Sequence, residues 1–164
     1  MSLYSFHLIR QKYIIFHNFA SIEVRKFPFN QVRMIKQDYL VRMILEIITL
    51  IANALLSKQK IRKQHWVEYD CLTRQILEIP SDKLIDLSPE EIVDRYEGDT
   101  NRMGKIELAA MTLLKISDEL DADNLLLKSR LKQNGTELLK FVQSQGDTFS
   151  LQRMSLISML EREN

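Results

Sequence analysis

LVRMILEIITLIANALL, at Leu40–Leu56, is the stretch that decides the fold of this chain of 164 residues. It is apolar except at Arg42, Glu46, Thr49 and Asn53, which recur every three or four residues. That spacing gathers the polar side chains into one narrow stripe of an α-helix and leaves the rest of its circumference apolar. Such a helix must be hidden at the centre of a bundle, in a dimer interface or in a membrane.

The rest of the chain also has the character of a helical protein. Only four Gly and three Pro interrupt it, which favours long helices over the frequent turns of an all-β fold. Short links between amphipathic helices favour antiparallel neighbours. We therefore expect an all-α fold, either an antiparallel helical bundle or a short stack of αα-hairpins. About six helices are expected, at 38–57, 64–78, a short segment opening at Pro89, 101–120, 124–144 and 148–162.

Capping residues predict where several of these helices begin. Asp38 is the expected start of the first helix, and Asp121 or Asp123 that of the fifth. The clearest start is Leu87-Ser-Pro-Glu-Glu-Ile92, where Ser88 and Glu91 have the spacing of a capping box. In the fifth helix the apolar stripe continues in phase past Asn134-Gly135, so we expect one helix, with a break there as the alternative.

Apolar residues at helical spacing predict which faces are buried. The expected inward residues are Trp66, Tyr69, Leu72, Ile76 and Ile79; Ile106, Ala109, Ala110, Leu113 and Ile116; Leu127, Leu131, Leu138 and Val142; and Leu151, Met154, Ile157 and Leu160.

A change in composition divides the chain near Met34. Residues 1–33 carry five basic residues and one acidic residue, with seven of the 13 aromatic residues, whereas the remainder is slightly acidic. Met34-Ile-Lys-Gln-Asp has the form of a natural start. We interpret 1–33 as an N-terminal extension, non-native or misannotated, with an extra packed element or a targeting segment as alternatives. Residues 34–164 form the single expected helical domain.

No constellation of residues predicts an enzyme, a metal site or a cofactor. The acidic cluster at Asp118–Asp123 lacks the spacing of a calcium-binding loop, and no two histidines lie one helical turn apart. The single cysteine, Cys71, excludes an internal disulfide framework and reads as a small buried residue. The four scattered glycines build no phosphate-binding loop. Cysteine usage favours a reducing compartment, and we expect a cytoplasmic protein.

The charge pattern bears on the class of partner. The run Lys58, Lys60, Arg62 and Lys63 is basic and Trp66 follows it, yet the net negative charge after residue 33 disfavours nucleic acid. The apolar stretch is short for a membrane span and contains Arg42 and Glu46, which disfavours a membrane.

The segment Gln37-Asp-Tyr-Leu-Val-Arg-Met-Ile44 resembles the opening of an uncharacterised family of small bacterial all-helical proteins. In that family a very apolar first helix follows such a segment, and the later helices are compared loosely with tetratricopeptide hairpins. The resemblance implies a native start near Met34 and a domain of unknown function, and it carries over no catalytic residue.

The sequence therefore favours a helical module that binds protein, with a second copy of the chain as one candidate partner. The candidate interaction surface comprises Arg42, Glu46, Asn53, Trp66 and Tyr69. The alternative is a peripheral membrane protein that uses the apolar helix 38–57 and the basic run 58–63.

Overall fold

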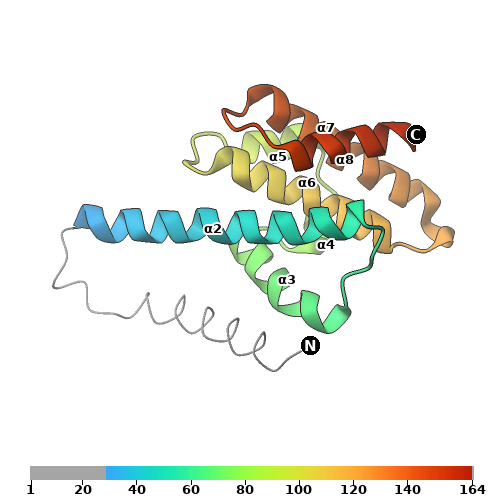
Figure 1. Ribbon diagram of the computed structural model, residues 1–164, viewed down its shortest axis with the longest axis horizontal. Helices are drawn as coiled ribbons and strands as arrows, with labels where there is room; N and C mark the ends of the chain where they lie inside the picture. The colour runs from blue at the N-terminus through green and yellow to red at the C-terminus, as the bar shows by residue number, and fades with distance from the viewer. Residues whose placement is uncertain (1–28, 164) are drawn as a thin grey trace. The chain divides into compact units, whose positions relative to one another are not determined.

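The computed structural model describes residues 29–163, with side chains from residue 36 onward. Over this range the chain is all-α, without a strand, and the expected helical bundle is confirmed. The helices are α2 (Phe29–Leu56), α3 (Lys63–Leu77), α4 (Ser81–Leu84), α5 (Pro89–Arg95), α6 (Arg102–Glu119), α7 (Leu125–Gln145) and α8 (Leu151–Arg162), with the 3-10 turn η1 (Ala122–Asn124) before α7 (Figure 1).

The chain divides into two units, residues 1–39 and 40–164, and the packing described below belongs to the second. The helix start predicted at Asp38 is wrong, because α2 begins at Phe29 and runs continuously past Met34. No Gly or Pro lies between Phe29 and Leu56, so nothing in the sequence interrupts the helix there. The predictions for residues 1–28 fall outside the described part of the chain.

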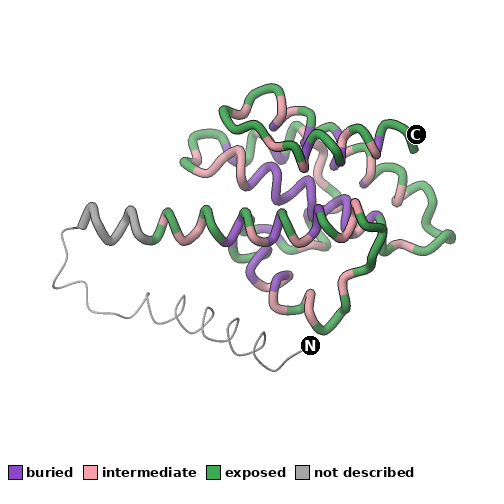
Figure 2. The backbone as a smooth tube through the Cα atoms, viewed as in Figure 1, coloured by how far each residue is buried: buried purple, intermediate pink, exposed green. Residues whose placement is uncertain are grey.

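The helix at the centre of the bundle is α6. Eleven consecutive residues, Lys105–Lys115, are buried, so α6 is covered around its whole circumference. It packs most extensively against α7 and also contacts α3 and α5. Figure 2 shows the buried residues concentrated along this helix. A helix in this position loses solvent on every side, which an amphipathic pattern does not predict.

Five polar residues on α6 are buried together with the apolar ones, and each of the five has a hydrogen-bonding partner, which removes most of the cost of burying it. The pairs are Lys105 with Asp99, Glu107 with Arg153, Thr112 with the carbonyl of Leu108, Lys115 with Glu119, and Ser117 with the carbonyl of Lys128.

The apolar helix α2 covers one side of the bundle. Ile44 lies next to α6, since a Cβ added at Gly104 would stand 3.3 Å from its Cγ2 atom. The outer stripe of α2 is exposed and includes Val41, Leu45, Arg42, Thr49 and Asn53, whereas Glu46 is half-buried. Its buried residues are Met43, Ile44, Ile47, Ile48, Ile51 and Ala52. The stretch is thus half hidden in the bundle, and the fully enclosed helix is α6 instead.

Helix α7 is continuous across Asn134-Gly135, as predicted. Gly135 is buried where α7 crosses α6. A Cβ at this position would lie 2.7 Å from the Cγ atom of Leu114 and 3.1 Å from the carbonyl oxygen of Ala110. The glycine therefore permits a close approach of the two backbones that no other residue would allow.

Of the two remaining helix starts predicted from capping residues, that of α5 is confirmed and that of α7 is wrong. At α5 the capping box is present, because Ser88 Oγ accepts a hydrogen bond from the Glu91 amide and the Glu91 carboxylate accepts one from the Ser88 amide. The expected cap of the fifth helix by Asp121 or Asp123 is wrong. Turn η1 contains Asp123 and α7 begins after Asn124, without a side-chain cap.

The buried face of α8 differs from the prediction. Arg153, Leu156 and Leu160 face inward, whereas Leu151 and Met154 are 73% and 43% exposed. The reason is that Arg153 finds a buried carboxylate on α6, and this pairing turns the apolar residues at the start of α8 outward. Four other residues expected inside are only half-buried: Trp66, Ile116, Leu127 and Ile157.

We predict that Gly135→Ala destabilises the protein, although alanine normally stabilises a helix interior relative to glycine. The added methyl group would overlap Leu114, and we expect a loss of about 1–3 kcal/mol in the free energy of unfolding, measured by urea denaturation. In a Leu114→Ala background the same substitution should cost clearly less. An equal cost in both backgrounds would contradict the proposed overlap.

Candidate functional site

The five residues predicted as an interaction surface occupy two helices. Arg42 and Asn53 are exposed on α2, whereas Tyr69 on α3 is only 7% exposed. The hydroxyl of Tyr69 donates a hydrogen bond to Glu46 Oε1 at 3.3 Å, which ties α3 to α2. Burial and the neighbouring Glu46 carboxylate raise the pKa of Tyr69 to about 12. The structure thus brings Glu46 and Tyr69 together in an internal contact between helices.

Trp66 completes this contact with a buried cation on α6. Its ring stacks on Tyr69 with 6.5 Å between centroids, and Lys115 Nζ lies 4.1 Å from the Trp66 ring centroid. The same ammonium group forms a 2.7 Å ion pair with Glu119. Lys115 is therefore held between an aromatic face and a carboxylate, which together compensate for its removal from water. This arrangement joins α3 to the central helix and leaves Trp66 half-buried.

Asn53 links α2 to α8. Gln152 Nε2 donates a hydrogen bond to Asn53 Oδ1 at 2.7 Å, so the start of α8 lies beside the C-terminal part of α2. Asn53 thus has a partner within the chain, and Arg42 is exposed on the same helix.

The orientation of α8 depends on Arg153, which is 3% exposed. Its guanidinium group donates to both carboxylate oxygens of Glu107, from Nε at 2.9 Å and from the second terminal nitrogen at 3.3 Å. The remaining terminal nitrogen donates to Gln143 Oε1 and to the carbonyl of Thr148, both at 3.2 Å. This bidentate pair and its supporting bonds join α6, α7 and the link before α8.

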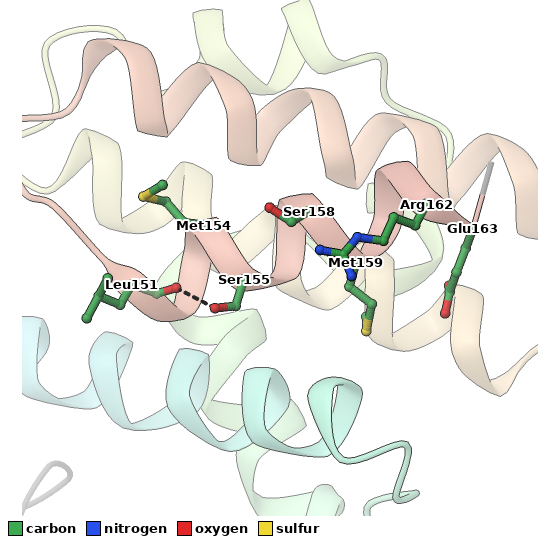
Figure 3. Close-up of a pocket in the computed structure, with 7 residues that line it drawn as sticks. All are labelled: Leu151, Met154, Ser155, Ser158, Met159, Arg162 and Glu163. Atoms are coloured by element: carbon green, nitrogen blue, oxygen red, sulfur yellow. Dashed lines mark hydrogen bonds between the residues drawn. The ribbon is translucent and has the colours of Figure 1, made fainter.

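With Arg153 inside, α8 presents an outer face that the helix packing leaves uncovered. We use "outer face of α8" for Leu151, Met154, Ser155, Ser158, Met159 and Arg162. Figure 3 shows these side chains along one side of the helix, where they line a shallow hollow that ends at Glu163. Phe149, 68% exposed, stands just before the helix. Rigidly held apolar side chains on an open face are typical of a contact surface.

A second candidate site is a cleft of about 290 Å³ where the end of α2 meets α6, α7 and α8. We call it the lysine cleft, after the four lysines in its lining, Lys58, Lys60, Lys128 and Lys132. Two of them belong to the basic run noticed in the sequence. The other two lie on α7, one helical turn apart, and only the folded structure brings them beside the run.

Side chains suited to holding a metal ion are not gathered anywhere in the part of the chain that the structure describes. No cluster of three or more His, Cys, Asp or Glu side chains with metal-binding geometry occurs there. Cys71 is half-buried on α3, with Gln75 Nε2 at 4.0 Å from its sulfur, and His65 packs edge-on against Tyr69.

Among the described helices, one is long and apolar enough to cross a membrane by length and composition. It is the part of α2 at Lys36–Leu56, with a mean hydropathy of 1.8, of which 33% is buried in the fold. The core helix of a soluble protein can have the same properties, so this is weak evidence for membrane contact.

Comparisons of the chain with family profiles, with curated proteins and with solved structures find no match. The resemblance of residues 37–44 to a bacterial family therefore stays a prediction, and functional proposals must come from the geometry alone.

We predict that Arg153→Met leaves Glu107 as an unpaired buried carboxylate and lowers the free energy of unfolding by about 3–5 kcal/mol. The double variant Arg153→Met, Glu107→Leu removes both charges and should recover most of this loss, because an apolar pair of similar volume replaces the ion pair. Urea denaturation followed by circular dichroism measures both effects. A double variant no more stable than Arg153→Met would contradict this account.

Proposed function

We propose that the protein is a helical interaction module and that the outer face of α8 binds the same face of a second copy of the chain. The proposal is carried by one observation, the orientation of α8. Arg153 shares its buried side with Leu156 and Leu160, while Leu151 and Met154 face solvent. The helix is fixed in this orientation by Arg153, so the apolar side chains are held ready for a partner and cannot turn inward.

The order of residues on this face supports a second copy as the partner. From Met154 to Met159 the sequence reads MSLISM, which is nearly the same in both directions. In a two-fold pair of antiparallel helices, Met154 of one chain lies opposite Met159 of the other, and Ser155 lies opposite Ser158. Two-fold interfaces use the same patch on both chains, so a self-complementary order of this kind suits them. The serines at the crossing point allow the helices to approach closely.

The size of the face sets the strength expected for the dimer. A helix of 12 residues is about 18 Å long, so a single helix pair falls below the roughly 800 Å² per partner of a standard interface. Phe149 and Leu151 extend the contact at each end. We therefore expect a concentration-dependent dimer with a dissociation constant on the order of micromolar.

We predict that the full chain changes from monomer to dimer over about 1–100 µM in sedimentation equilibrium. Met154→Lys should raise the dissociation constant at least about tenfold, because it buries an ammonium group against a methionine. Adding Met159→Glu to that variant should restore association, since the proposed register places the two new charges opposite each other.

Leu126→Lys is the matched control, because Leu126 is 90% exposed near the start of α7 and outside the proposed contact. It should leave the dimer unchanged. The proposal fails if the wild-type chain stays monomeric throughout, or if Met154→Lys leaves a dimer intact.

Peripheral membrane association is the second candidate function, and the observation in its favour is the apolar length of α2. Its exposed stripe contains Leu45, which is 55% exposed, and the basic run begins just after its last turn. An apolar helix followed by lysines suits an anionic bilayer surface.

Flotation of the full chain with vesicles rich in phosphatidylserine tests this second candidate. Membrane association predicts co-flotation that NaCl weakens, and Leu45→Glu should reduce it severalfold, because a carboxylate would enter the apolar contact. Leu126→Glu should have a much smaller effect. Protein that remains at the bottom of the gradient at low salt would exclude this function.

A further inference from the structure

The lysine cleft combines converging positive charges with an apolar wall. Lys58 and Lys60 follow the end of α2, whereas Lys128 and Lys132 project from α7. Asp118 and Glu163 are the carboxylates in its lining, so the cleft carries an excess of two positive charges. Its apolar lining consists of Leu55, Leu114, Met159 and Leu160.

Two of the four lysines are not neutralised by carboxylates. Among the described residues, the acceptor for Lys128 Nζ is the carbonyl oxygen of Leu120, at 3.2 Å. Within residues 36–163 neither Lys128 nor Lys60 forms an ion pair. Like charges gathered in a cleft repel one another unless an anion lies between them, so this arrangement favours a negatively charged ligand.

Glu163, directly after α8, already places an anion at the edge of the cleft. Its Oε2 atom lies 3.2 Å from Lys132 Nζ and its Oε1 atom lies 3.6 Å from Lys58 Nζ. The hydrogen bond from Lys132 lowers the pKa of Glu163, with a further contribution from the charge of Lys58. This side chain is well exposed, so its ion pairs are weak and a multivalent anion can replace them.

The backbone at Lys58 is left-handed, as it also is at Glu78 at the end of α3. Lys58 has a φ of 53° and closes α2. Its amide donates a hydrogen bond to the carbonyl oxygen of Leu55, and the amide of Gln59 donates one to the carbonyl oxygen of Ala54. Glycine is the residue that suits this left-handed position at a helix end.

The volume and the lining define the class of ligand. About 290 Å³ is near the lower end of the range for small-molecule sites. Lysine ammonium groups bind phosphates as point charges, and the leucine and methionine wall can hold an apolar group. The geometry points to a site for a small organic phosphate or diphosphate, in which the phosphate displaces Glu163 from Lys132 and Lys58.

Isothermal titration of the full chain with inorganic pyrophosphate at low ionic strength tests this site. Glu163→Gln should bind about two- to fivefold more tightly than wild type, because it removes the internal competitor. The double variant Lys128→Gln, Lys132→Gln should lose at least about tenfold in affinity. Lys58→Gly should weaken binding while leaving the melting temperature unchanged or higher, which separates loss of binding from loss of fold.

Lys140→Gln is the matched control, because Lys140 lies on the same helix and pairs with Glu161 outside the cleft. It should bind pyrophosphate like wild type. An equal loss in Lys140→Gln and in the cleft variants would indicate general attraction to positive charge and would overturn the site. The absence of binding to wild type and to Glu163→Gln would overturn it as well.

A competition experiment distinguishes a free phosphate ligand from the phosphate of a lipid headgroup. Vesicles containing phosphatidic acid should fail to compete with pyrophosphate if the ligand is soluble, since the cleft is small. Competition that disappears in the Lys128→Gln, Lys132→Gln variant would assign the same phosphate chemistry to a lipid headgroup.

Discussion

Complete enclosure of α6 is the constraint that the other helices satisfy. Because Lys105–Lys115 is buried without interruption, α3, α5 and α7 must cover it from several directions. Close packing then requires Gly135 where α7 crosses α6. Burial of charged residues on the same helix requires partners, and for Glu107 the partner is Arg153 on α8, which is itself buried. The positions of α7 and α8 therefore follow from what α6 needs in order to be buried.

The sequence predicts local features of this fold well and long-range choices poorly. The capping box at Ser88 and the continuity of α7 depend on residues close in the chain, and both are confirmed. For α8, Leu160 is buried as predicted, but the prediction was wrong for Leu151 and Met154, because helical periodicity identifies an apolar stripe but not a distant carboxylate such as Glu107. Local sequence also does not reveal how many neighbours will cover a helix. The apolar segment at Leu40–Leu56 was therefore expected to be hidden, whereas the helix enclosed on every side is α6.

The candidate sites repeat this pattern. The sequence placed Glu46 and Tyr69 in one candidate interaction surface, and the structure joins them in a hydrogen bond between helices. It marked the basic run, but it contained no sign that Lys128 and Lys132 would lie beside it, since about 70 residues separate the two segments. Met159 and Glu163 border both the outer face of α8 and the lysine cleft. The two proposed surfaces are therefore adjacent on the molecule.

Burial of α6 on every side also has a consequence for the dynamics of the chain. Its backbone amides can meet solvent only when α3, α5 and α7 separate from it, which amounts to opening most of the unit. Exchange of these amides with deuterated water should then report the global unfolding reaction, whereas α2 and α8, each with one open side, can exchange through smaller local openings. The molecule thus combines a slowly exchanging centre with outer helices that exchange more readily along their open sides.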